Sequence, residues 1–476
     1  MPGPSGVEPD ASTARTGRHA TEPVVARARL LPGRLGDVIV GVIAVAVAVT
    51  LLVSLTRSPA APSSNADGPQ QSGATTSASP DATAPSPSAA DALPATGADP
   101  SGSGSPAAPS ARPVPPAYPP SGRVLQLAAF RAMGDGRTDD TRAVQRALDA
   151  LRPGDELQVP AGKTYRHTKV LRVHTLGARI TGGGTFLATA QASSSFLVDA
   201  DRVTVDGSLT FRLASSTKRW ETYDQMKLRL GAHTGIVISG VTVDGSAAAG
   251  IYVGAATHFL LVDVTVRNTR ADGIHITEGS SYGVVTGATV SNTGDDGIAV
   301  VSYLGSRLAH DIAVTSPRFS GQTWGRAFSV VGGTRVTWKD IFATGSSAAA
   351  VYIAAEPGYR TWGSSHVTVT GGTIELANRT TSVQHGAVLI YNGETGQTNT
   401  DITVQGLTIR STRASSPADV RILSDSSRCV QRRILITGIT VVGGPRKGFS
   451  NNAGSGAYRL SAFTKNGVAV ASHRGW

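Results

Sequence analysis

The sequence predicts an all-β fold in which short strands stack as a solenoid, and its internal repeat and its composition indicate this. The segments 241–253 (VTVDGSAAAGIYV), 264–276 (VTVRNTRADGIHI) and 288–300 (ATVSNTGDDGIAV) are variations on one unit. Their second valines lie 23 and 24 residues apart, a step typical of stacked coils that bury their apolar faces together. The chain also has 55 glycines and only 5% aromatic residues, which favours many tight turns over a helical core.

The N-terminal part predicts a membrane anchor. Residues 1–37 are polar and carry several arginines, and residues 38–56 contain no charge over 19 positions. At about 1.5 Å per residue, such a helix just crosses a hydrocarbon core of roughly 30 Å. Because arginines precede this segment, we expect a single-pass cell-membrane protein with a cytoplasmic N-terminus and an extracytoplasmic remainder. A cleaved signal peptide is the alternative.

A linker and one folded domain follow. Residues 57–118 are almost all Ser, Ala, Pro, Gly, Thr and Asp, a composition that buries too little apolar surface to fold, so we expect a disordered linker. Residues 119–476 are then the β-solenoid domain. Cys429 is the only cysteine, so an exported domain must be held together by packing rather than by an intramolecular disulfide.

The first element of the domain is expected to be an amphipathic helix. Thr138 or Asp139 can cap it, and it continues to about Leu151, before the helix-stopping pair 153–154 (Pro-Gly). A solenoid has an open end with unpaired strand edges, and a helix laid over that end covers it.

Short strands follow with Gly, Asn and Asp turns between them. The runs expected to form strands are 178–183, 202–207, 235–240, the three repeat units, 310–316, 327–333, 335–342, 350–355, 366–376, 401–411 and 434–444. The insertions 214–232 and 355–365 interrupt the period and should form loops over one face. Residues 445–476 either close the C-terminal end or pair with a partner.

The charge is uneven along the chain. Residues 1–120 carry 7 Lys/Arg and 8 Asp/Glu, which leaves 37 of the 44 basic and 25 of the 33 acidic groups for residues 121–476. This excess indicates attraction to a polyanion such as an acidic glycan, or a merely solubilising surface. Because the sequence has no zinc-finger spacing or other nucleic-acid motif, no nucleic-acid partner is expected.

Two sets of motifs carry a family resemblance. Residues 134–150 (GDGRTDDTRAVQRALDA) and 159–166 (VPAGKTYR) resemble the opening of pectate-lyase-superfamily proteins. Residues 268–277 (NTRADGIHIT) and 292–303 (NTGDDGIAVVSY) resemble two motifs of glycoside hydrolase family 28, the polygalacturonases. The resemblance covers roughly 121–445 and implies a single-stranded right-handed parallel β-helix that acts on polysaccharide.

Three aspartates are the candidate catalytic carboxyls. Asp272, Asp295 and Asp296 begin adjacent strands, about 4.8 Å apart in a stacked sheet. Neighbouring carboxylates repel, so one should keep its proton while another stays ionised, as an acid and a base require. The resemblance implies inverting hydrolysis, with Asp295 as the general acid and with Asp272 and Asp296 holding the water. Alternatively the aspartates only stabilise turns, as Asn268 and Asn292 are expected to do.

Alternation along the strands predicts a column of outward side chains beside these aspartates. Tyr252, His275, Ala299, Ser329 and Tyr352 should share one face, as a trough with small residues at its centre and a tyrosine at each end. Tyrosine faces suit stacking against sugar rings. The alternative is that these aromatic rings pack under loops.

The family pattern then breaks in two places. Polygalacturonases have a Gly-His-Gly where this chain has 325–327 (Gly-Arg-Ala), and an Arg-Ile-Lys where it has 351–353 (Val-Tyr-Ile). These departures put galacturonan specificity in doubt. Arg326, together with Arg360 in the next loop, is the candidate replacement contact for a substrate anion.

Other readings remain open. His275 beside Asp272 could abstract the C5 proton of a uronic acid, which is lyase or C5-epimerase chemistry. A tethered β-helix could also bind wall glycan without catalysis. No cofactor is expected; hard oxygen ligands at the aspartates would suit calcium, but the sequence has no specific calcium motif. We expect a glycoside hydrolase that cleaves an anionic or cell-wall polysaccharide.

Overall fold

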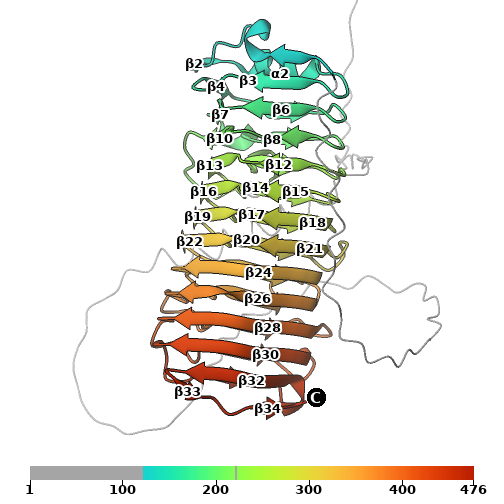
Figure 1. The fold of residues 1–476 in the computed structure, drawn as a ribbon. Coiled ribbons are helices and arrows are strands. Elements are labelled where there is room, and N and C mark those ends of the chain that lie inside the picture. The colour runs from blue at the N-terminus through green and yellow to red at the C-terminus, as the bar shows by residue number, and fades with distance from the viewer. Residues whose placement is uncertain (1–121, 220–221) are drawn as a thin grey trace, which may run out of the picture.

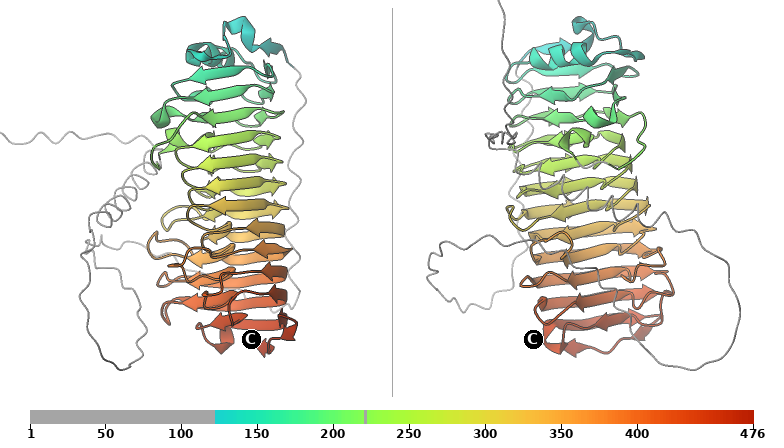
Figure 2. Two further views of the ribbon diagram at one scale, coloured as in Figure 1. Left: turned by 90° about the vertical axis from the view of Figure 1, so that its left-hand side faces the viewer. Right: turned by 180° about the vertical axis from the view of Figure 1, so that it is seen from behind.

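The computed structural model describes residues 122–219 and 222–476, so the tail, membrane segment and linker predicted for 1–118 lie outside the described residues. Within the described residues, no helix is long and apolar enough to cross a membrane. The β-coils stack along one axis, with the N-terminal coil at one end and the C-terminal coil at the other (Figures 1 and 2). The predicted all-β solenoid of parallel strands is confirmed.

Two parallel sheets run along the stack. In the described part of the chain, the larger sheet has 23 strands and the smaller has 11. The larger sheet contains β1 (Val124–Gln126), β2 (Asp135–Asp139), β3 (Glu156–Val159), β4 (Thr164–His167), β6 (Arg179–Gly182), β7 (Thr185–Ala188), β9 (Thr204–Val205), β10 (Thr210–Leu213), β12 (Val237–Ser239), β13 (Thr242–Ser246), β15 (Leu260–Val262), β16 (Thr265–Thr269), β18 (Ser281–Thr286), β19 (Thr289–Thr293), β21 (His310–Thr315), β22 (Arg318–Gln322), β24 (Thr334–Thr344), β26 (Ser365–Glu375), β28 (Thr398–Arg410), β30 (Val430–Val442), β32 (Tyr458–Lys465), β33 (Val468–Ala469) and β34 (His473–Arg474). The smaller sheet contains β5 (Leu171–Val173), β8 (Phe196–Val198), β11 (Leu228–Leu230), β14 (Ile251–Gly254), β17 (Ile274–Thr277), β20 (Ile298–Val301), β23 (Phe328–Val331), β25 (Val351–Ala355), β27 (Val388–Asn392), β29 (Val420–Ser424) and β31 (Phe449–Asn451).

The helices are few and short. They are η1 (Leu127–Phe130), α2 (Thr141–Asp149), η2 (Gln191–Ser193), η3 (Tyr223–Gln225) and η4 (Ser455–Ala457). Helix α2 lies at the N-terminal end of the stack (Figure 1) and buries its apolar stripe there. It begins at Thr141 and not directly after the predicted cap Thr138 or Asp139, because both of these residues belong to strand β2, which pairs with β4. The Asp140 carboxylate accepts hydrogen bonds from the backbone N–H groups of Met133 (2.7 Å) and Gly134 (3.0 Å).

The core is built from columns of identical positions in successive coils. In the smaller sheet, Ile251, Ile274 and Ile298 pair in register and are fully buried. In the larger sheet, Val243 and Val266 also pair in register and are fully buried. Each coil therefore covers the apolar side chains of the one before it, which is how coils too short to fold alone form a continuous core.

The expected asparagine ladder is present at the turn that leads from the larger to the smaller sheet. Asn268 and Asn292 have φ angles of 60° and 52°, a left-handed conformation that asparagine tolerates better than most residues. Asn268 Nδ2 donates to Asp244 Oδ1 at 2.7 Å, and Asn292 Nδ2 donates to Asn268 Oδ1 at 3.5 Å. At the far end of the stack, β33 and β34 fold back on β32 as antiparallel strands, so the tail closes the C-terminal end.

The repeated glycine of each unit is required by space. A Cβ added to Gly273 would lie 2.6 Å from the carbonyl oxygen of Gly297 and would collide with a methyl group of Val290 in the next coil. Gly250 and Gly297 are confined in the same way by the coils that follow them. The turns before β14, β17 and β20 therefore have room only for glycine.

Gly273→Ala is expected to destabilise the domain by about 1–3 kcal/mol, since overpacking a tight site forces the neighbouring backbone to move. Thermal unfolding of the wild type and the variant measures this. Gly358→Ala is the matched control, because a Cβ at Gly358 meets no atom within 4 Å. Equal melting temperatures for Gly273→Ala and Gly358→Ala would show that the turn is not tightly packed.

Candidate active site

The candidate site is built on the turns that precede β17, β20 and β23. The larger-sheet strands β16 and β19 end at Thr269 and Thr293, whose hydroxyls donate to the carbonyl oxygens of Ala271 (2.7 Å) and Asp295 (2.6 Å). These local bonds tighten each turn before its glycine. Because the turns repeat in adjacent coils, the aspartates that follow them are brought together.

The three predicted aspartates meet, but at different depths. The Asp295 side chain is 19% exposed, whereas those of Asp272 and Asp296 are 12% and 6% exposed. Asp272 Oδ1 accepts the backbone N–H of Asp296 at 2.9 Å, which ties two coils together. Asp295 is therefore the carboxyl of this group that solvent and ligands reach most readily.

Both deeper carboxyls are engaged by the protein. Asp272 Oδ2 lies 2.5 Å from His275 Nδ1. Asp296 accepts the Ser329 hydroxyl at 2.5 Å and the backbone N–H of Arg326 at 2.7 Å. These bonds hold the two carboxyls in fixed orientations behind Asp295.

Burial and mutual repulsion shift the ionisation of the group. The pKa of Asp296 is raised to about 7, chiefly by burial. The negative charges of Asp295 and Asp272 also raise this pKa, and the positive charge of Arg326 lowers it but does not cancel the increase. Burial and then the charge of Asp272 raise the pKa of Asp295 above its usual value, and Arg219 and Arg326 oppose them.

Histidine 275 is held as part of the same group. Burial lowers its pKa, but the hydrogen bond and charge of Asp272, with Asp296 and Glu278 nearby, raise that pKa overall. Its ring stacks on Tyr252 with the centroids 5.5 Å apart.

The predicted column of outward residues is confirmed in register, but it does not form an open trough. Tyr252, His275, Ala299, Ser329 and Tyr352 pair in sequence across β14, β17, β20, β23 and β25. Tyr252 is 5% exposed, Tyr352 is 2% exposed and Ser329 is fully buried. These three side chains are therefore not open to a ligand in this structure, because Tyr223 packs on Tyr252, His385 stacks on Tyr352, and the Ser329 hydroxyl is bonded to Asp296.

Each tyrosine has a partner that explains its burial. Tyr252 packs with Tyr223 and donates its hydroxyl to Glu278 Oε1 at 3.0 Å. Tyr352 stacks on His385 with the centroids 5.5 Å apart. They support the site rather than line it.

Arg326 is likewise committed to the protein. Its Nη2 donates to Glu356 Oε1 at 2.6 Å, its Nη1 lies 3.7 Å from Asp296 Oδ1, and its guanidinium lies 4.1 Å from the centre of the Tyr352 ring. Its charge therefore balances buried carboxyls, and contact between Arg326 and a substrate anion stays a prediction. Arg360 is exposed in the loop beside Tyr359.

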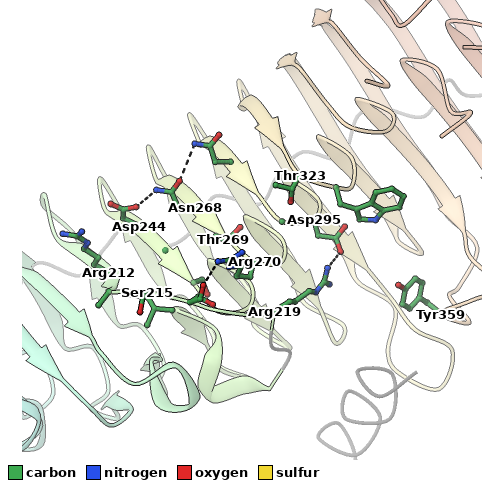
Figure 3. Close-up of a pocket in the computed structure, with 18 residues that line it drawn as sticks. Arg212, Ser215, Arg219, Asp244, Asn268, Thr269, Arg270, Asp295, Thr323 and Tyr359 are labelled. Carbon is green, nitrogen blue, oxygen red and sulfur yellow. Dashed lines mark hydrogen bonds and ion pairs between the residues drawn. The ribbon is translucent and has the colours of Figure 1, made fainter. Parts of the chain in front are cut away.

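A groove of about 920 Å³ runs along the turns beside the aspartates and reaches Asp295 (Figure 3). Its lining includes Arg212, Asp244, Asn268, Arg270, Asn292, Asp295, Thr323, Trp324 and Tyr359, together with Arg219. Arg219 Nη1 donates to Asp295 Oδ2 at 2.6 Å. Trp324 is 50% exposed and Tyr359 is 45% exposed, so the aromatic surface available to a sugar lies here.

Sequence reasoning missed Arg219, Trp324 and Tyr359 as site residues. The signal was the pair of insertions at 214–232 and 355–365, which were expected to form loops over one face. That expectation is only partly right. Arg219 from the first insertion and Tyr359 from the second both line the groove, but the first insertion also contains η3 and strand β11, which pairs with β8 and β14 in the smaller sheet. Over the two described ranges, no group of three or more His, Cys, Asp or Glu side chains is arranged to hold a metal ion.

The raised pKa of Asp296 predicts a pH-dependent stability difference for Asp296→Asn. A carboxyl whose pKa rises from 3.8 to about 7 on folding contributes fully below the unfolded pKa, and that contribution is lost as pH rises through about 7. Between pH 5 and pH 8, the wild type should lose about 2–3 kcal/mol of unfolding free energy relative to the variant.

Denaturant unfolding at several pH values measures this difference. Asp340→Asn changes an exposed aspartate outside the groove and should track the wild type across the range. Parallel curves for the wild type and Asp296→Asn would contradict the raised pKa.

Comparisons with known proteins agree with this architecture. Residues 127–352 match a family model described as "Rhamnogalacturonase A/epimerase, pectate lyase-like". No curated protein sequence matches the chain. The domain resembles several solved structures at low sequence identity.

The first is the catalytic domain of a GH87 α-1,3-glucanase (D1069A) in complex with tetrasaccharides, with a TM-score of 0.58 and 17% identity. The alignment covers 70% of this chain and 64% of that one, so this chain spans less than two thirds of its length. The catalytic unit of a GH87 α-1,3-glucanase from Streptomyces thermodiastaticus has a TM-score of 0.53 at 17% identity, with 74% and 69% covered. The Streptococcus pneumoniae surface protein and adhesin PfbA has a TM-score of 0.51 at 13% identity, with 72% and 100% covered. At these identities the likeness shows the fold alone, and together with the family match over residues 127–352 it supports a pectate-lyase-superfamily parallel β-helix.

Proposed function

We propose that the β-helix domain hydrolyses an anionic or cell-wall polysaccharide that lies in the groove, with inversion at the anomeric carbon. The observation that carries this proposal is the position of Asp295. Its carboxyl reaches the groove, while two further carboxyls lie behind it on the same and the adjacent coil. The arrangement supplies one proton donor at the groove and two further carboxyls as candidates for the base that activates water.

Each group has a defined part in the reaction. Asp295 gives its proton to the glycosidic oxygen as the bond from the anomeric carbon to that oxygen breaks. A water molecule attacks the anomeric carbon from the opposite face and passes its proton to Asp272, with Asp296 helping to hold the water. Asp272 then releases its proton to solvent and Asp295 takes one up, so that each turnover consumes one glycosidic bond and one water and restores both carboxyls.

The ionisation of the group supports the division of roles. Burial and the charge of Asp272 raise the pKa of Asp295, so it keeps a proton at a higher pH than an ordinary aspartate. A general acid works best when its pKa lies near the working pH.

The groove supports a glycan, and an acidic one. Arg212, Arg219 and Arg270 line it and outnumber Asp244 and Asp295. Trp324 and Tyr359 offer exposed aromatic faces in the same groove. The matched family is described as rhamnogalacturonase A/epimerase, and two solved relatives are α-1,3-glucanases, which favours carbohydrate as the substrate class.

We propose further that residues 38–56 anchor the protein in the cell membrane, with the N-terminus cytoplasmic and the β-helix outside, carried on the 57–118 linker. The charge-free run and the arginines before it motivate this. Protease added to intact cells should remove the β-helix domain, and a fully protected domain would refute the topology.

A second candidate function is uronate lyase or C5-epimerase chemistry. The 2.5 Å contact between His275 and Asp272 favours it, because a carboxylate orients an imidazole for proton transfer. The raised pKa of His275 works against it, since a protonated imidazole cannot take the C5 proton. Glycan binding without turnover is the third reading, and the assay below separates all three.

Asp295→Asn is expected to reduce hydrolysis by about 10²–10⁴-fold, because an amide cannot donate the required proton. Residues 119–476 are incubated with polygalacturonate, alginate and a neutral α-1,3-glucan while new reducing ends and ultraviolet absorbance are followed together. Asp340→Asn, outside the groove, should retain wild-type rates.

The outcomes discriminate the three candidates. Reducing ends without absorbance support hydrolysis. Reducing ends with the absorbance of an unsaturated uronate, or a loss confined to His275 variants, support the lyase. Binding without either product, and without exchange of the C5 hydrogen for solvent deuterium that an epimerase would cause, supports a glycan-binding domain. Full activity of Asp295→Asn would refute Asp295 as the general acid.

Trp324→Ala is expected to weaken glycan binding by about 5- to 30-fold, because burying one face of an indole stabilises a complex by about 1–2 kcal/mol. Isothermal titration calorimetry with a glycan bound by the wild type measures this. Trp476→Ala is the control: Trp476 is 44% exposed, much like Trp324, but lies at the C-terminal end of the chain outside the groove. Equal affinities for both variants would place the glycan elsewhere.

A further inference from the structure

Arg219 meets Asp295 from a distant part of the chain. It stands between β10 and η3, three coils before Asp295 and 76 residues away, and its Nη1 lies 2.6 Å from Asp295 Oδ2. Figure 3 shows the two side chains pointing toward each other in the groove. The arginine side chain is 40% exposed and the aspartate side chain is 19% exposed, so the ion pair lies where a ligand can reach it.

This ion pair conflicts with the role of Asp295. A guanidinium beside a carboxyl favours the ionised form, so Arg219 opposes the burial and the Asp272 charge that raise the pKa of Asp295 overall, whereas a general acid must carry a proton. The pair therefore describes a resting state that has to open before the proton can be transferred.

The other charged groups that face Asp295 cannot open in this way. They are Asp272, Asp296 and Arg326. The side chain of Arg326 is 19% exposed and is bound to Glu356 at 2.6 Å, and Asp272 and Asp296 are fixed by hydrogen bonds from His275 and Ser329. Arg219 is the most exposed of these groups and is carried by a loop rather than by a coil.

The groove supplies a reason for Arg219 to leave. Arg270 and Arg212 line the same groove, so an anionic polymer is drawn to this side of Asp295. Arg270 Nη2 also donates to the carbonyl oxygen of Ser216, which holds the start of the Arg219 loop against the groove. A carboxylate on the polymer would be an equivalent partner for the Arg219 guanidinium.

We propose that Arg219 exchanges partners when substrate binds: its guanidinium moves away from Asp295 and pairs with a carboxylate of the glycan. Asp295 then becomes protonated only when an anionic substrate is in place. This inference rests on the proposed function of Asp295. It makes Arg219 a positioning and specificity residue for uronate-containing glycans.

The exchange has a balanced proton count. In the free protein Asp295 is a carboxylate paired with Arg219. On binding, Arg219 moves to the glycan carboxylate, and Asp295 takes up one proton from solvent. That proton is the one later given to the glycosidic oxygen, so binding itself should consume protons.

Calorimetry tests the exchange without requiring turnover. Trigalacturonate is titrated into residues 119–476 at several pH values, in buffers of different ionisation enthalpy, to obtain the protons taken up per site. Galactotriose serves as the neutral probe of the same length. The wild type should take up protons on binding trigalacturonate and none on binding galactotriose.

Arg219→Gln is expected to bind trigalacturonate about tenfold more weakly and to take up fewer protons, because its Asp295 has already lost the ion pair. Its affinity for galactotriose should match that of the wild type, and Arg219→Lys should recover part of the lost affinity. Arg335→Gln is the matched control, since Arg335 pairs with Asp311 at 2.7 Å and is 46% exposed, but does not line the groove.

The result that overturns the inference is unchanged proton uptake or unchanged trigalacturonate affinity in Arg219→Gln, or no binding of trigalacturonate to the wild type. Failure of the proposed function looks different. Arg219-dependent proton uptake without any hydrolysis would support the partner exchange and reject the hydrolase. Hydrolysis without Arg219-dependent proton uptake would support the hydrolase and reject the partner exchange.

Discussion

The spacing of the coils is the constraint on which the rest of the structure depends. Parallel backbone hydrogen bonding holds successive coils about 4.8 Å apart, and the glycines before β14, β17 and β20 let the coils pack this closely without a clash. A residue type repeated at one position of the unit therefore becomes a continuous column. In the core this gives the stacked isoleucines of β14, β17 and β20. At the turns it forces the carboxyls of Asp272, Asp295 and Asp296 together.

Bringing carboxyls together in a poorly solvated place is costly, and the surrounding groups show how the cost is offset. Asp272 and Asp296 receive backbone N–H groups from the following coil, a histidine and a serine hydroxyl. Arg326 supplies the compensating charge and is itself balanced by Glu356. What these partners leave uncompensated appears as the raised pKa values of Asp295 and Asp296. The same partners fix the carboxyls in orientation, and such rigidity favours a reacting group over a merely structural turn residue.

The sequence predicts the periodic part of this arrangement and not the irregular part. The repeat step places Tyr252, His275, Ser329 and Tyr352 in one column, and the asparagines in one ladder, because each follows from local alternation and a fixed coil length. The covering of Tyr252 and Tyr352 depends on residues such as Tyr223 and His385 in non-repeating segments. Arg219 and Tyr359 reach the groove through insertions that obey no period. The sequence therefore predicts which carboxyls meet, whereas the loops decide that the accessible surface lies along the turns.

The two arginines near the carboxyls show why the loops matter for chemistry. Arg326 follows a turn of the coil itself, is fixed by Glu356 and packs over the Tyr352 ring, so its charge is a permanent part of the field at Asp296. Arg219 carries the same charge on an exposed loop, and its contact with Asp295 is the kind of pair that solvent and competing anions weaken. A fixed cation can set the average ionisation of a carboxyl, but it cannot make that ionisation depend on what is bound. The ionisation of Asp295 can depend on a bound ligand only if an anion of that ligand can draw the neighbouring cation away. Among the charged groups that face Asp295 in the described residues, Arg219 is the cation in that position.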